Sequence, residues 1–320
     1  MWQPAIPASF FSIVLGIVGL GSAWRAASVA WGIKVWPSES LMALGASIWG
    51  FLLLAYGAKW VFNKPEAMAE IRHPVQCCFV SLVPACTTLM GLVVAPYARE
   101  LAMGLWIIGT VGQLGFVMFR AEGLWRGDLD INFVTPILYL PTVAANLISS
   151  IVAGALGLIS WGYLFLGMGF FSWIAIESVL LMRLWIAPPL SLPLRPSLGI
   201  HMAPPVVASV AYLSNTFGKP DLFVVGMWGY GLLQLLYLVR LLPWVRQQEF
   251  SASYWGYSFG ATAVTVAGIQ MAIRDPHSAM ALLSIPLFLF SNGVILLLLT
   301  GTLIRIVQGR LLPRPLTHTT

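Results

Sequence analysis

The sequence predicts an all-α integral membrane protein, in which ten transmembrane helices form five helical hairpins arranged as an inner ring within an outer ring. Three observations predict this class: the composition, the spacing of the apolar segments, and an alternation between small-residue and bulky segments. Of the 320 residues, 59% are hydrophobic and 9% are charged, whereas soluble domains average about 45–50% apolar and about 25% charged residues. No soluble core could bury so much apolar surface, so residues 1–320 are expected to form a single transmembrane domain.

Ten apolar segments have the length of a membrane-spanning helix, which takes about 20 residues per crossing. Short polar stretches with proline, such as Lys64-Pro65 and Pro188-Pro189, separate them. No Lys or Arg precedes the first apolar run, which is therefore expected to be a retained helix and not a cleaved signal peptide. The predicted spans are residues 8–30, 39–62, 75–95, 99–120, 137–158, 161–185, 197–216, 221–242, 253–272 and 279–305, and residues 306–320 form a predicted cytoplasmic tail.

The basic residues indicate how the chain crosses the membrane. Of the 17 Lys and Arg residues, 12 fall in the tail or near the loops after even-numbered spans, and 5 fall on the other side. Since Lys and Arg are enriched in cytoplasmic loops, both termini are expected in the cytoplasm, as an even number of spans requires. This bias explains the net charge of +6, so we infer contact with lipid phosphates and no nucleic-acid partner.

The odd-numbered and even-numbered spans differ in character. The odd-numbered spans begin about 56 to 67 residues apart, one helical hairpin each, whereas the even-numbered spans are bulky, as in Ile295 to Leu299. Glycine and proline at membrane depth are tolerated where freed backbone groups face protein or a water-filled cavity, so the odd-numbered spans are expected around a central path. The alternative is that glycine and proline are simply common in membrane helices. The glycines and prolines of the odd-numbered spans that suggest the central path are Gly16, Gly19, Gly21, Pro84, Pro141, Pro204, Pro205, Gly256 and Gly260.

One large side chain, Phe259, lies among small residues in the ninth span. Gly256 and Gly260 are four residues apart, so they share a helix face that lets another helix approach closely. Phe259 is rotated by about 100° from Gly260 on an α-helix. It is expected to point into whatever the bundle encloses, where an aromatic ring would block a narrow apolar pore. A packing role is the alternative.

Few polar residues lie at membrane depth. Glu177 in the sixth span is expected to form either a buried ion pair, for which Arg183 and Arg120 are candidate partners, or a subunit contact, and a proton relay is the alternative. Asn146 in the fifth span either lines the path or hydrogen-bonds two helices. Ion-coupled transporters usually have more ionisable residues at the midplane, so their scarcity favours passive conduction.

The three cysteines, Cys77, Cys78 and Cys86, are an odd number within an apolar segment and do not form a disulfide framework. They are expected to be small buried apolar residues, and a vicinal thiol pair that reacts with a soft oxyanion is the alternative. The sequence has no spacing typical of a metal site, no phosphate-binding loop and no nucleophile–base pair. We therefore predict no enzyme activity, no cofactor, and no catalytic or metal-binding residue.

Seven stretches of the sequence form a recognisable set of motifs. They are Arg72-His73-Pro74-Val75, Phe79-Val80-Ser81-Leu82-Val83-Pro84-Ala85, Gly123-Leu124-Trp125-Arg126-Gly127, Leu138-Tyr139-Leu140-Pro141-Thr142-Val143-Ala144-Ala145-Asn146, Ser197-Leu198-Gly199-Ile200, Gly229-Tyr230-Gly231-Leu232-Leu233-Gln234-Leu235-Leu236 and Ser258-Phe259-Gly260. Together these motifs resemble the family that contains the bacterial tellurite-resistance proteins (TehA), the plant guard-cell slow anion channels and the C4-dicarboxylate (malic acid) transporters. The resemblance extends from Phe10 to Gln308, with a departure at Cys77-Cys78, where relatives usually have small hydroxyl residues.

This resemblance implies a bacterial inner-membrane protein with five hairpins in a quasi-five-fold arrangement, odd-numbered helices inside, and one pore in each subunit of a homotrimer. It also implies that Phe259 occludes the pore, through which small inorganic anions pass when the ring moves, and it suggests a connection with tellurite resistance. Helix position then assigns further residues to the pore wall. They are Gly16, Val83, Asn146, Ala208 and Gly260.

Two other functions stay open at this point. One is a carrier that exports tellurite, dicarboxylates or toxic compounds by coupling to protons through Glu177. The other is a non-conducting membrane subunit that docks a cytoplasmic partner through its basic loops. Voltage-dependent current without proton coupling would distinguish the channel from the carrier.

Overall fold

The structure is a computed structural model that describes residues 6–127 and 129–312, and within these ranges it contains helices and no strand. Eight of the helical spans there are long and apolar enough to cross a membrane. The elements in chain order are η1 (Ala8–Phe10), α1 (Phe11–Trp31), α2 (Trp36–Phe62), α3 (Lys64–Arg72), α4 (Cys77–Val80), α5 (Leu82–Val94), α6 (Arg99–Trp125), η2 (Ile131–Phe133), η3 (Pro136–Leu138), η4 (Leu140–Ala144), α7 (Ala145–Ala155), α8 (Ile159–Ile186), η5 (Leu192–Met202), α9 (Ala203–Asn215), α10 (Leu222–Val245), η6 (Ala252–Trp255), α11 (Gly256–Arg274) and α12 (Ala279–Val307).

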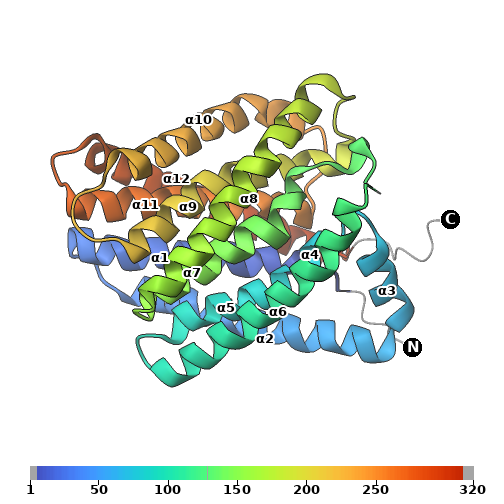
Figure 1. The fold of residues 1–320 in the computed structure, drawn as a ribbon, viewed down its shortest axis with the longest axis horizontal. Helices are drawn as coiled ribbons and strands as arrows, with labels where there is room; N and C mark the ends of the chain where they lie inside the picture. The colour runs from blue at the N-terminus through green and yellow to red at the C-terminus, as the bar shows by residue number, and fades with distance from the viewer. Residues whose placement is uncertain (1–5, 128, 313–320) are drawn as a thin grey trace.

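The helices pack as successive pairs. Each of α1, α5, α7, α9 and α11 packs against the long helix that follows it, and these five also contact one another in chain order, with α11 contacting α1. In the spans that contain α1, α5 and α7, 61–83% of the residues are buried, but only 22–33% are in α2, α6, α8, α10 and α12. The second member of each pair therefore presents most of its surface outward, as α10 and α2 do at opposite edges of Figure 1.

Proline interrupts the buried segments near their first turns. Pro84 has no N–H to donate to the carbonyl of Val80, and the chain divides there into α4 and α5. Pro141 lies in η4, a π-helical turn, and Pro196 lies in the 3-10 segment η5. The α-helices α5, α7 and α9 consequently begin six to eight residues inside their predicted spans.

Two of the ten predicted spans are not among the eight long apolar helices. Residues 197–216 contain part of η5 and α9, which is only 13 residues long. Residues 253–272 contain α11, whose 19 residues include several polar side chains. In addition, α3 was not predicted, because its charged residues interrupt any apolar run. Residues 313–320 of the predicted tail lie outside the described ranges.

Gly162 on α8 shows how closely the helices approach. A Cβ added there would lie 1.7 Å from Oδ1 of Asn215, whose Nδ2 donates to the backbone oxygens of Ser150 and Ala211. We expect Gly162→Ala to lower the free energy of unfolding by about 1–3 kcal/mol, the usual cost of overpacking. Gly167→Ala on the same helix is the control, since nothing lies within 4 Å of its added Cβ. Equal thermal midpoints in detergent for the two variants would contradict this prediction.

Candidate functional site

Two cavities lie between the five mutually contacting helices α1, α5, α7, α9 and α11. The first has a volume of about 290 Å³ and the second about 370 Å³. The first reaches the turns that precede these helices, at Ser9 and Ser253, and the second reaches their C-terminal ends, at Val29 and Ile273. None of the lining residues comes from α2, α6, α8, α10 or α12.

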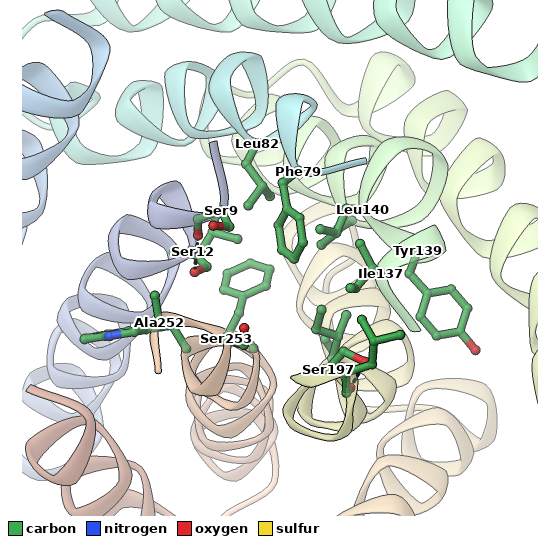
Figure 2. Close-up of a pocket in the computed structure, with 18 of the residues that line it drawn as sticks. Ser9, Ser12, Phe79, Leu82, Ile137, Tyr139, Leu140, Ser197, Ala252 and Ser253 are labelled. Carbon is green, nitrogen blue, oxygen red and sulfur yellow. Dashed lines mark hydrogen bonds between the residues drawn. The ribbon is translucent and has the colours of Figure 1, made fainter. Parts of the chain in front are cut away.

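Phe259 lies in the walls of both cavities. The only other residue common to the two walls is Val207, on α9. The two spaces are therefore consecutive, and the Phe259 ring stands where they meet. Residues of the surrounding segments that border the first cavity are drawn in Figure 2: Ser9, Ser12, Phe79, Leu82, Ile137 and Leu140.

The direction of Phe259 follows from the contacts of its neighbours. Ser258 faces α1, because a Cβ added at Gly16 would lie 2.5 Å from the Ser258 Cβ. Gly260 faces the start of α9, because its added Cβ would lie 2.9 Å from Cε of Met202. On a helix with about 100° per residue, Phe259 must point between these two contacts, into the space that α1 and α9 leave open.

The cavity walls carry almost no charge. Among the residues that the structure describes, their lining includes no Asp or Glu and one basic residue, Arg25, which borders the second cavity. Arg25 is paired with Glu39, 3.1 Å away. Four hydroxyl groups of the walls donate to backbone carbonyls three or four residues earlier in the chain. These bonds are Ser12 to Ser9 O, Ser22 to Val18 O, Ser214 to Val210 O and Thr262 to Ser258 O.

All five inner helices run from the first cavity to the second. Residues of their first turns line the first cavity: Ser12, Leu82, Leu147, Ala203 and Gly256. Residues of their last turns line the second: Val29, Leu92, Ala155, Ser214 and Ile273. An α-helix carries a partial positive charge of about half an elementary charge at its N-terminus. Five such ends favour an anion in the first cavity, and the opposite partial charge of the five C-termini lies around the second cavity.

Four residues that helix position assigns to the pore wall lie in helix contacts or elsewhere. Gly16 faces Ser258 of α11, and Gly260 faces Met202 and Ala203. Val83 lines a separate apolar cavity near α6. Ala208 is fully buried and lines neither central cavity.

Asn146 likewise lies outside both cavity walls. Its side chain bonds to the amide of Gln113 at 2.7 Å and donates to Thr142 O, so it joins α6 to α7. In each of these cases an adjacent residue faces a cavity instead, because one position turns a helix by about 100°. The adjacent residues are Leu15, Leu82, Leu147, Val207 and Phe259.

Glu177 lies at the centre of a buried hydrogen-bond network. Its carboxylate accepts hydrogen bonds from Tyr139, from Nε1 of Trp173 at 3.0 Å and from Tyr230 at 2.6 Å. Nε2 of His201 lies 3.4 Å from the same carboxylate. The network joins α8 to α10, to η5 and to the turn that begins at η3. Of these residues, Tyr139 also borders the first cavity.

Neither arginine suggested as a partner for Glu177 pairs with it among the described residues. Arg120 donates to the carbonyl of Pro74 at 3.0 Å, and Arg183 has no carboxylate partner among the described residues. Neutral donors and one histidine surround the carboxylate instead. Cys77 and Cys78 are free and buried, and neither lines a described cavity.

The fold and the site define a multi-pass helical membrane protein in which five contacting helices enclose two consecutive cavities. The chain belongs to the voltage-dependent anion channel (SLAC1) family, whose model matches residues 5–303, and this confirms the resemblance seen in the motifs.

Named relatives agree with this family. The chain is 34% identical to the tellurite resistance protein TehA homolog of Haemophilus influenzae over 306 residues, 95% of this chain and 92% of that protein. It is 22% identical to the guard cell S-type anion channel SLAC1 of Arabidopsis thaliana over 310 residues, 93% of this chain and 55% of the plant protein. It is 23% identical to the uncharacterized transporter MJ0576 of Methanocaldococcus jannaschii over 237 residues, 65% of this chain and 66% of that protein.

Proposed function

We propose that this protein is an anion channel whose pore runs through the first and second cavities and is closed by Phe259. The observation that carries the proposal is the chemistry of the walls. Within the described part of the chain, the walls include no carboxylate, one arginine at one end and the first turns of five helices at the other. In the first cavity a cation would meet these positive helix ends and no acid, whereas an anion would be attracted; the second cavity is bordered by the negative C-terminal ends of the same helices together with Arg25. The names of the relatives, an S-type anion channel and a tellurite resistance protein, support this assignment.

The proposed architecture is a quasi-five-fold ring of five hairpins with ten crossings. The closed series of contacts from α1 through α11 supports it. The short α9 and the polar α11 count as crossings, because a helix surrounded by protein need be neither long nor wholly apolar. We further propose a homotrimer with one pore in each protomer, in a bacterial inner membrane, with the basic loops and both termini in the cytoplasm.

The ion selectivity tests this proposal directly. We expect purified protein in planar bilayers, under a salt gradient, to show a reversal potential with the sign that an anion-selective current produces. The apolar walls replace little of an ion's lost hydration, so nitrate and iodide should permeate several-fold better than chloride. Protein-free bilayers are the control. A reversal potential of cation sign, or preference for the most strongly hydrated anion, would contradict the proposal.

A proton-coupled carrier is the second candidate, because the Glu177 network includes Tyr139 in the first cavity wall. We expect Glu177→Gln to keep its anion selectivity and to conduct equally with and without a pH gradient. The amide nitrogen would face several donors, so stability should fall by about 1–3 kcal/mol. Glu100→Gln, at an exposed residue of α6, is the control. Transport driven by a pH gradient in wild type, and lost in folded Glu177→Gln protein, would favour the carrier.

A further inference from the structure

A third cavity lies where α8 and α10 begin and where α9 and α11 end. Its volume is about 360 Å³, and it shares no lining residue with the first two cavities. Most of its wall is polar, unlike theirs. The polar lining residues are Tyr163, Tyr212, Thr216, Lys219, Asp221 and Arg274.

Two cationic side chains in this wall have unused donors. Arg274, at the end of α11, donates from Nη2 to Leu213 O and has no carboxylate partner among the described residues. Nζ of Lys219 lies 3.8 Å from Oδ1 of Asp275, and the Lys219 side chain is 80% exposed. A guanidinium has five N–H donors and an ammonium has three. Together they can bind the oxygens of a phosphate group.

Two carboxylates balance these cations. Asp221 caps α10 by accepting from the N–H of Val224 at 3.1 Å and from the hydroxyl of Tyr212. Asp275 lies beside Lys219. A simple anion would meet these carboxylates as well as the cations. A zwitterion fits the wall better, with its phosphate at Arg274 and Lys219 and its ammonium at Asp221.

Exposed apolar side chains flank the cavity. Phe217, in its wall, is 84% exposed, and Leu222 at the start of α10 is 89% exposed. Aromatic residues are enriched at the boundary between membrane and water, at the level of lipid headgroups. The cavity therefore lies where a molecule with a polar head and an apolar body would find both kinds of contact.

We propose that the third cavity binds a phosphate ester that also carries a primary amine, the chemistry of an ethanolamine headgroup, supplied by a lipid or by a soluble phosphoamine. Bound there, the ligand bridges the α9–α10 loop to the last turn of α11, the helix that carries Phe259. Binding at this site is independent of whether the central path conducts.

Native mass spectrometry of the purified protein tests the proposal. The probes are phosphatidylethanolamine, phosphatidylcholine, phosphatidylglycerol and soluble glycerophosphoethanolamine. We expect phosphatidylethanolamine to bind about tenfold more tightly than the other two lipids. Lys219→Gln or Arg274→Gln should lower the affinity for phosphatidylethanolamine about tenfold. Lys34→Gln is the control, since Lys34 is an exposed basic residue in the α1–α2 loop.

The soluble probe distinguishes the two sources. Competition by glycerophosphoethanolamine at affinity equal to the lipid would support a soluble ligand, and binding of the lipid alone would support a membrane ligand. Because Arg274 also bonds Leu213 O, Arg274→Lys provides a variant that keeps this contact. Equal binding of all three lipids, or wild-type affinity in both Gln variants, would overturn the proposal.

Discussion

Phe259→Ala is expected to raise anion current at least about tenfold over wild type at equal protein density, with an unchanged reversal potential. The side chain stands where the first and second cavities meet, so its loss joins them into one path. About 1.4 kcal/mol of barrier corresponds to each tenfold change in rate, and an apolar constriction that expels water imposes at least that much on a hydrated ion. The fold should survive, because Ser258 and Gly260 make the helix contacts on either side.

Two comparisons make this result specific. Phe171→Ala removes the same ring from the outer face of α8, where Phe171 is 72% exposed, and should leave the current at the wild-type level. Phe259→Leu keeps a branched apolar side chain and should give a smaller increase than alanine. Wild-type current from folded Phe259→Ala protein would show that the ring packs the core and does not close a path.

The class of fold could be predicted because the bilayer imposes length and apolarity on any helix that faces lipid. The eight long apolar helices lie where the sequence has long apolar segments. The segments that differ most from expectation, η5 with α9 and η6 with α11, lie inside the bundle. Protein and not lipid surrounds them, so neither length nor apolarity is imposed there. The charged α3 gives no signal of this kind.

The cavity walls were harder to predict than the helices that form them. Phe259 was identifiable because it is a large side chain among small neighbours. The rotation of the other helices depends on contacts between distant segments, such as Gly16 with Ser258, and one residue of error moves a side chain out of the wall. This is why Gly16 and Val83 were assigned where Leu15 and Leu82 line the cavity.

The partners of Glu177 show a second reason why side-chain contacts were harder to predict than helices. A buried carboxylate within an apolar span suggests a partner of opposite charge, but neutral hydrogen-bond donors can satisfy it as well. Tyr139 and Tyr230 come from distant positions in the chain, and both are tyrosines within apolar segments that need an acceptor for their hydroxyl groups. The need of these two hydroxyl groups for an acceptor was the signal in the sequence that could have identified them as partners of Glu177.

Lys59→Met is expected to cause the largest loss of stability among these substitutions. Nζ of Lys59 lies 2.9 Å from Oε2 of Glu70, with side chains only 2% and 1% exposed. Oε1 of Glu70 accepts from the N–H of Ala8 at 2.8 Å. Glu70 thus joins α2, α3 and η1, next to Ser9 in the first cavity wall. Removing the cation leaves a buried carboxylate without its charged partner, which should cost about 3–5 kcal/mol.

A double-mutant cycle separates the pair from its surroundings. Lys59→Met with Glu70→Met removes both buried charges, so it should recover much of the loss, because apolar replacements of a buried pair are often nearly neutral. Recovery should be incomplete, since the Ala8 N–H loses its acceptor. Thermal unfolding in detergent measures each step, with Lys64→Met at an exposed residue of α3 as control. If the Lys59→Met and Lys64→Met variants have the same thermal unfolding midpoint, the Lys59–Glu70 pair does not hold α3 and η1 in place. If Lys59→Met alone is unstable and also loses anion current below its unfolding midpoint, the pair positions the mouth of the first cavity.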